Sequence, residues 1–428
     1  MATAAHPDPT NHTKFDLKPF KIDLSSKVPH LKTLVSNTRL PAKPLYPDLG
    51  PDKGIQLEFL SSLKEEWVTS YDWDAEQAKL NEFKHFTAVI EGLTVHFIHE
   101  KSADTDAIPV ILLHGWPSSF HEFTPVIKPL TQCWTNAAGK KVSFNVVVPS
   151  LPGFMFSSLP AVNWTTDDTA RIFNTLMTDV LGYPKYAVHA TDWGCVVGYS
   201  LYSTFTTTVR AAQFAFIPFA PPSREQMAAE NITLTAEQNV TVARQSAASK
   251  TGLGFRDMQT NKPNDVGLSL YDNPVGQLAW MGGKIKLCAV RPPARARPPS
   301  QLTSTAILTS VSLYYLTDSF LSSLWIYVAN PEAFSSVYTN KAASAAAPML
   351  FSQYKYNVAY WPEEFVAKVG NLVSYTGALR SRLIPRVRKL IGLDLKYAVH
   401  DFGGHFPGLD NPPAVIADIH EVAAYWKV

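Results

Sequence analysis

Several features that mark other classes of protein are scarce in this chain. Only three cysteines occur among its 428 residues, Cys133, Cys195 and Cys288, and none stands in a Cys-x-x-Cys pair. They suggest neither a disulfide framework nor a cysteine-rich metal site, and they fit a reducing compartment, so we expect the cytoplasm. The first 15 residues lack a basic segment followed by an apolar core. We therefore expect no signal peptide and no transmembrane segment.

An excess of charge of one sign is also missing. The 38 Lys and Arg nearly balance the 36 Asp and Glu, which gives a net charge of +2. Binding to a phosphate backbone normally needs a larger basic excess, so we expect no nucleic-acid partner. What the chain has is apolar: 46% of its residues are hydrophobic and 12% aromatic, which suits a globular protein with a greasy internal pocket.

The length predicts more than one structural unit, and the hydrophobic pattern divides the chain into four parts. We expect an N-terminal arm and helical extension over residues 1–90, with an extended arm in the first 45 and helical periodicity from Ile55 to Trp73. An alternating apolar cluster, 83–98, predicts a strand. The first part of an α/β core should cover 91–220, a helical lid 221–351 and the last part of the core 352–428. The oligomeric state is left open, a homodimer included.

Three apolar runs in the core predict buried parallel strands that end in loops. They cover residues 108–113, 145–148 and 186–189, and a later strand is expected over 395–399, before a closing helix over 413–426. Alternation of strands and helices implies a doubly wound sheet with its ligand site at the carboxyl ends of the strands. The loops after these strands are therefore where we look for chemistry.

The third run leads into Ala190-Thr191-Asp192-Trp193-Gly194, which has the form of a nucleophile elbow. Small residues flank such a turn because strand and helix backbones approach closely there, lifting the central side chain into the pocket. The alternative is that Asp192 only caps the following helix. After the first run, His114-Gly115-Trp116-Pro117 would let the Trp116 and Trp193 amides form an oxyanion hole. His405, in Gly403-Gly404-His405-Phe406, completes a set in hydrolase order.

Taken together, these residues resemble the epoxide hydrolases of the microsomal type, which are α/β-hydrolases. The resemblance runs from about Phe20 to the C-terminus and includes Val148-Pro149-Ser150-Leu151-Pro152-Gly153-Phe154 and the lid segment Asn273-Pro274-Val275-Gly276. It implies a doubly wound sheet with an inserted helical lid and an N-terminal arm. By motif, it assigns the nucleophile to Asp192, the base to His405, the supporting acid to Glu364 and a lid tyrosine to Tyr327. Glu363, next to Glu364, remains the alternative acid. A purely structural alternative is that both glutamates are solvated residues at the start of a helix.

Two features depart from the family pattern. The family uses two lid tyrosines, but the first falls on Phe255, so one hydroxyl is missing unless Tyr271 or Tyr314 supplies it. The 41 positions between Glu364 and His405 also form a longer interval than is usual, with the excess over about 379–393.

The resemblance implies that Asp192 attacks a small, largely apolar epoxide to form an ester, which water activated by His405 then hydrolyses to a vicinal diol. This chemistry needs no cofactor and no metal. Two alternatives stay open. A dehalogenase of the same fold shares the aspartate and histidine, and a catalytically weak binding or scaffold protein would fit Phe255 and the long interval.

Overall fold

The computed structural model describes residues 14–50, 53–136, 139–288, 299–335, 347–376 and 402–426. Within these ranges, nine strands form one sheet in the order β1-β2-β3-β7-β4-β8-β9-β10-β11. The strands are β1 (Lys18–Phe20), β2 (His85–Ile90), β3 (Leu93–Glu100), β4 (Ile108–Leu113), β7 (Phe144–Pro149), β8 (Tyr186–Ala190), β9 (Val209–Phe214), β10 (Met349–Ser352) and β11 (Leu372–Thr376). In this order, neighbouring strands from β7 through β4 to β11 pair in parallel. The pairs β1-β2, β2-β3 and β3-β7 are antiparallel.

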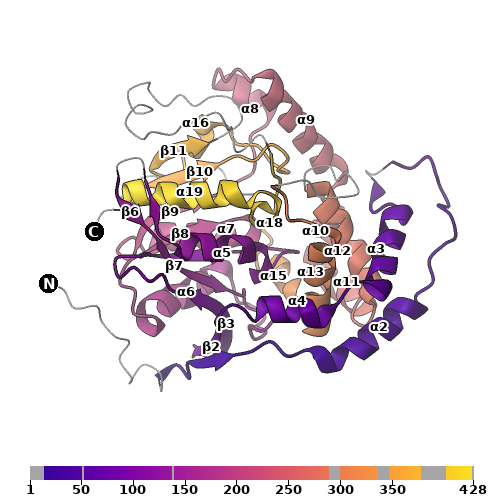
Figure 1. The fold of residues 1–428 in the computed structure, drawn as a ribbon. Helices are drawn as coiled ribbons and strands as arrows, with labels where there is room; N and C mark the ends of the chain where they lie inside the picture. The colour runs from indigo at the N-terminus through magenta and orange to yellow at the C-terminus, as the bar shows by residue number, and fades with distance from the viewer. Residues whose placement is uncertain are drawn as a thin grey trace.

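Helices cover both faces of the parallel part, as the continuous apolar strands require. Helices α5 (Thr124–Thr131) and α19 (Pro412–Tyr425) lie on one face, and α6 (Thr166–Thr175) and α7 (Asp192–Thr204) on the other (Figure 1). The small sheet of β5 (Trp134–Thr135) and β6 (Lys141–Val142) stands apart. This architecture confirms the predicted doubly wound α/β fold and brings the loops after β4, β8 and β10 to one edge of the sheet.

An all-helical segment follows β9, where an inserted lid was expected. It comprises α8 (Arg224–Ala229), α9 (Ala236–Thr251), α10 (Gly254–Asn261), α11 (Pro263–Ser269), α12 (Pro274–Cys288), α13 (Ser304–Leu316), α14 (Ser319–Ser323) and α15 (Trp325–Ala329). The chain rejoins the sheet at β10, slightly before the boundary we expected at residue 352. In α13 every residue from Ala306 to Leu316 is buried, so this helix is the core of the lid.

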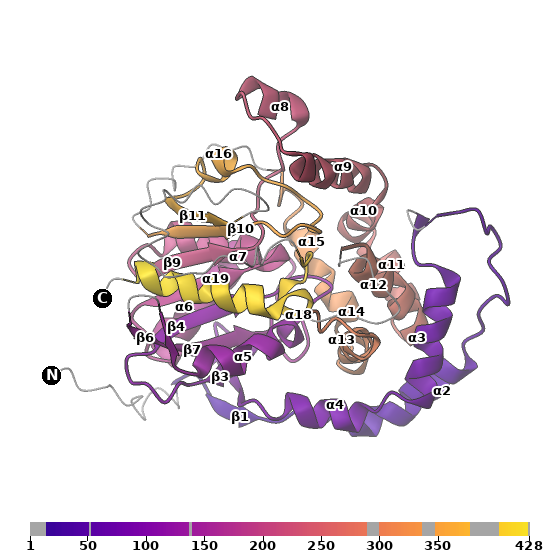
Figure 2. The same ribbon diagram turned by 45° about the horizontal axis from the view of Figure 1, so that its top comes forward.

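The N-terminal arm packs against the lid and is hydrogen-bonded to it. Its helices are α2 (Val28–Asn37), α3 (Leu57–Thr69) and α4 (Trp73–Leu80), and Figure 2 shows α2 and α3 at the outer side of the lid helices. The indole N–H of Trp67 donates to Ser312 Oγ at 3.1 Å, and Lys27 Nζ lies 2.6 Å from Asp318 Oδ2. The first part of the arm is therefore not simply extended as expected, because α2 forms where the chain packs on α3 and α12.

Two other predictions from the sequence concern strands. The cluster read as one strand over 83–98 is a hairpin of β2 and β3, turning at Glu91 and Gly92 with φ of 51° and 83°. The strand expected over 395–399 and the long interval at 379–393 lie outside the described residues. No helix in the described part of the chain is both long and apolar enough to span a bilayer.

Candidate active site

Asp192 stands at the junction of β8 and α7 in a strained backbone conformation. Its φ of 45° is in the left-handed region, which side chains other than glycine rarely adopt. Two glycines make room for the turn: a methyl group on Gly115 would lie 2.0 Å from Asp192 Oδ1, and one on Gly194 would lie 2.2 Å from the Leu113 carbonyl oxygen. The elbow predicted from the sequence is therefore present, and Asp192 is the first residue of α7 rather than the residue that caps it.

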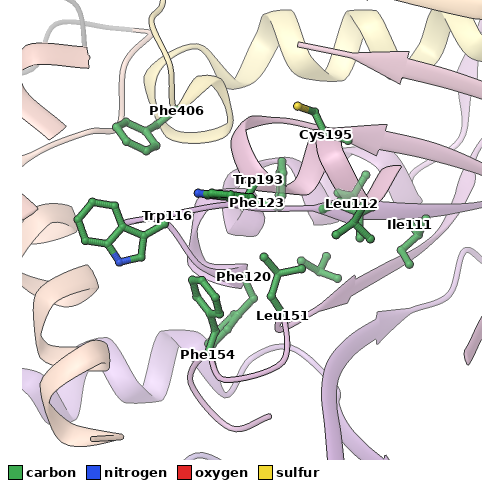
Figure 3. Close-up of a cluster of buried hydrophobic side chains, with 14 of the residues drawn as sticks. Ile111, Leu112, Trp116, Phe120, Phe123, Leu151, Phe154, Trp193, Cys195 and Phe406 are labelled. Atoms are coloured by element: carbon green, nitrogen blue, oxygen red, sulfur yellow. The ribbon is translucent and has the colours of Figure 1, made fainter. Parts of the chain in front are cut away.

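The carboxylate of Asp192 is held on the side of the β4 loop. The Trp116 backbone N–H donates to Asp192 Oδ1 at 2.6 Å, and the Trp193 amide nitrogen borders the same corner, 2.5 Å from where a Gly115 methyl would be. Figure 3 shows Trp116 at the left of a packed group of apolar side chains that includes Trp193, Phe120 and Phe154. These contacts place both predicted oxyanion-hole amides beside the carboxylate.

His114, a buried histidine near the elbow, has a structural role. His114 Nε2 accepts from the Leu151 N–H at 3.2 Å, and its Nδ1 lies 3.0 Å from the Gly115 carbonyl oxygen. Burial lowers the pKa of His114 to about 4, so the ring is neutral at ordinary pH. It ties the loop after β4 to the loop after β7.

His405 reaches Asp192 from the other side. It lies just before α18 (Pro407–Asp410), is buried, and places Nε2 2.8 Å from Asp192 Oδ2. Its ring packs edge-on against Phe216, with ring centroids 5.0 Å apart. The aspartate and histidine singled out in the sequence are thus in hydrogen-bond contact, although 213 positions separate them.

The structure does not bring Glu364 to His405. Glu364 is exposed in α16 (Glu363–Val366), as is Glu363, so both predicted acids face solvent. The other ring nitrogen, His405 Nδ1, lies 2.9 Å from Oδ1 of Asn357, a buried side chain in the loop after β10. An amide therefore stands where we expected a carboxylate. The prediction missed it because only acidic residues were considered for this place.

The lid closes the site with aromatic side chains. Tyr327, on α15, is buried, and its ring lies edge-on to Trp193 with centroids 4.8 Å apart. Phe255, on α10, stacks on Trp116 at 5.6 Å and meets the Tyr327 ring at 6.4 Å. Both predicted lid residues therefore contact the loops that carry Trp116 and Trp193, and their rings form an apolar wall over these loops.

Tyr327 adds a hydroxyl group to this apolar wall. Burial and the negative charge of Asp192 raise the pKa of Tyr327 above its ordinary value, so the hydroxyl keeps its proton and can donate it. The Trp193 indole and the Gln259 side chain act in the opposite direction, since both stabilise the phenolate.

Gln259, one turn after Phe255 on α10, was not predicted from the sequence as a site residue. It is fully buried and accepts from the Trp280 indole at 2.8 Å through Oε1, which leaves its Nε2–H as the group that can stabilise the Tyr327 oxygen.

The two tyrosines considered as substitutes do not fill the missing place. Tyr314 is buried in α13, but its hydroxyl donates to the Ser118 carbonyl oxygen at 2.7 Å. Tyr271 is 47% exposed at the end of α11. The lid therefore presents Tyr327 to the site, with Phe255 beside it.

Comparison with known proteins gives this geometry a family. Residues 17–123 match the family described as epoxide hydrolase N terminus, and residues 108–327 match the alpha/beta hydrolase fold. The juvenile hormone epoxide hydrolase of Bombyx mori is 29% identical over 430 residues, covering 94% of this chain and 85% of the relative. Epoxide hydrolase 1 of Sus scrofa is 25% identical over 434 residues, covering 95% and 88%.

Solved structures agree. The structure of the Aspergillus niger epoxide hydrolase superposes with a TM-score of 0.76 at 28% sequence identity and covers 96% of each chain. The match extends over the arm, the sheet and the lid. This chain belongs to the epoxide hydrolases of the α/β-hydrolase fold, which are enzymes that hydrolyse the ether bond of an epoxide.

Proposed function

We propose that the protein opens a small, largely apolar epoxide through a covalent ester on Asp192. A carboxylate oxygen of Asp192 attacks one epoxide carbon, and the bond from that carbon to the ring oxygen breaks. The oxygen leaves as an alkoxide that takes a proton donated by Tyr327. The product of this half-reaction is an alkyl ester bearing a vicinal hydroxyl.

The second half-reaction returns the enzyme to its starting state. His405 takes a proton from water, and the resulting hydroxide adds to the ester carbonyl carbon. The Trp116 and Trp193 amides stabilise the oxyanion. The ester C–O bond then breaks, the leaving alkoxide takes a proton from His405, and a vicinal diol departs. The proton left on the Asp192 carboxyl group returns to the Tyr327 phenolate, which restores both residues.

One observation carries the proposal: both oxygens of a buried aspartate on a strained elbow are held, one by a backbone amide and one by a histidine. A residue that merely caps a helix needs neither partner. The aromatic rings of Trp116, Trp193, Phe255 and Tyr327 support an apolar substrate, because a charged one would lose its hydration there without compensation. The free thiols of Cys133 and Cys195 support the cytoplasm as the proposed compartment.

The test follows the oxygen atom in a single turnover in ¹⁸O-water. A panel of aryl, terpenoid and fatty epoxides is first screened for diol formation, and the fastest substrate is used with enzyme in excess. In the ester route the diol receives an unlabelled oxygen from Asp192, and the heavy oxygen stays on the enzyme. Peptide mass spectrometry around Asp192 should find it, and Asp192→Ala should be inactive. Label in the first-turnover diol with none in that peptide would contradict the mechanism, and halide release from haloalkanes without diol formation would favour the dehalogenase.

A further inference from the structure

The partner of His405 differs chemically from what a general base of this kind needs. Water activation puts a positive charge on the imidazole, and an adjacent carboxylate stabilises that charge. His405 Nδ1 instead faces the neutral amide of Asn357 at 2.9 Å. On the basis of the proposed function, we infer that Asn357 is a positioning residue which fixes the tautomer of His405 without lending it charge, so that hydrolysis of the Asp192 ester limits turnover.

The orientation of the Asn357 amide is fixed by its other contacts. Its Nδ2 donates to the Ala215 carbonyl oxygen at 3.2 Å, and its Oδ1 accepts from the Val358 N–H at 2.8 Å. Asn357 is 2% exposed, so water does not replace these partners. The oxygen of the amide must therefore face His405, and Nδ1 of the ring carries a proton. This is the tautomer that leaves Nε2 to act on water, so the amide orients the ring as a carboxylate would.

The nearest negative charge to His405 is that of Asp192. In the resting enzyme Nε2 lies 2.8 Å from the Asp192 carboxylate, while Nδ1 faces the neutral Asn357 amide. Alkylation of Asp192 removes that negative charge. The remaining ring contacts among the described residues are the uncharged Phe216 and Phe406. The cation that forms when His405 takes a proton from water therefore has no charged partner.

Asn357 also shows why an acid is absent. A carboxylate at this position would place an oxygen against the Ala215 carbonyl oxygen, where the amide N–H now donates. Two acceptors at that distance repel, whereas the amide satisfies both sides. The pocket is thus built for an amide.

The first test uses the unaltered protein. With the epoxide chosen from the panel at saturating concentration, intact mass during steady-state turnover should show the alkylated enzyme as the main species. About one equivalent of epoxide per site should also disappear in a fast phase. A mainly unmodified mass, together with diol formation, would overturn the inference while leaving the ester mechanism to the ¹⁸O test. Failure of His405→Ala to trap any ester from an epoxide that the wild type hydrolyses would count against the proposed function itself.

The second test changes the charge. In Asn357→Asp the ester should hydrolyse roughly tenfold faster in a single turnover, because the attraction between a full negative charge and the imidazolium outweighs the repulsion from the Ala215 carbonyl dipole. The acid limb of the pH–rate profile should move upward by about one to three pH units, as expected for a histidine beside an opposite charge.

Asn357→Leu, of similar size, is the matched control: it removes positioning without adding charge and should hydrolyse the ester more slowly than the wild type. Ester formation should change little in either variant. A folded Asn357→Asp protein with the wild-type hydrolysis rate and pH profile would mean that the neutral partner does not limit the reaction.

Discussion

Phe255 keeps a ring in the lid where the family has a phenol. The ring lies against Trp116, whose amide holds Asp192, and against Tyr327, so position 255 is next to the lid hydroxyl. In the proposed mechanism Tyr327 is then the lid hydroxyl that donates to the epoxide oxygen. Loss of one donor weakens stabilisation of the alkoxide as the ring opens.

We therefore expect Phe255→Tyr to form the Asp192 ester roughly 10- to 100-fold faster, since a positioned general acid contributes about 10² to 10⁴ in rate and Tyr327 already supplies part of it. Single-turnover epoxide consumption is the measurement, because steady-state turnover reports ester hydrolysis if that step is slow. Phe255→Leu, which lacks both ring and hydroxyl, should show no gain. A folded tyrosine variant with an unchanged rate would show that this position does not face the epoxide oxygen.

At the level of single residues, the sequence predicted side chains whose place depends on local pattern. Asp192 follows a buried strand in a turn that only small neighbours permit, and His405 follows glycines near the closing helix. Asn357 and Gln259 carry no such pattern. Their importance comes from partners 48 and 21 positions away, which only the folded chain brings together.

Among the elements, α13 connects the arm to the loop after β4. On one side Ser312 accepts from the Trp67 indole, and on the other Tyr314 donates to the Ser118 carbonyl oxygen, two residues beyond Trp116. Trp67 is 1% exposed on α3, with Leu60 and Leu63 buried on the same face. The arm thus stabilises the lid helix that supports the loop carrying the Trp116 amide.

Trp67→Ala should lower the free energy of unfolding by about 3–5 kcal/mol, the usual cost of removing a buried large aromatic side chain. Trp67→Phe keeps most of the ring area and loses the hydrogen bond to Ser312, so it should cost less, about 0.5–1.5 kcal/mol for that bond, plus any packing defect. Urea unfolding measures both. A loss below about 1 kcal/mol for the alanine variant would show that the arm does not stabilise the lid through this contact.

Element prediction succeeded where periodicity was strong and failed where a turn lay inside an unbroken pattern. The run over 108–113 is strand β4, and the expected closing helix over 413–426 corresponds to α19 (Pro412–Tyr425). The 83–98 cluster became a hairpin because Glu91 and Gly92 both take positive φ, as a tight turn with matching twist requires. Glutamate is not a usual residue for that position, so the sequence carried a weak signal.

For the whole molecule, the buried ionisable groups set how stability varies with pH. Burial raises the pKa of Glu122 to about 8, and the charge of Asp192 adds to this, against the lowering by the Ser118 hydroxyl and the Gly408 amide. Glu122 lies in the short 3₁₀ helix Phe120–Phe123, behind the catalytic loop, and is 1% exposed. It is therefore a neutral carboxylic acid in the folded protein at neutral pH and a carboxylate in the unfolded chain.

The sign of the effect follows from these two states. Because the folded pKa of Glu122 exceeds its unfolded value of 4.5, its favourable contribution is complete below pH 4.5 and is lost as pH rises toward 8. Each pH unit in this interval costs about 1.4 kcal/mol. Glu122→Gln has an uncharged side chain of the same shape at every pH, so relative to the wild type it should gain roughly 3 kcal/mol between pH 5 and 7.5. Buried histidines such as His121 and His189, whose pKa values are lowered to about 4, affect both proteins equally and cancel in the difference. Urea unfolding of both proteins at several pH values is the measurement, and parallel stability curves would mean that Glu122 is already ionised in the folded enzyme.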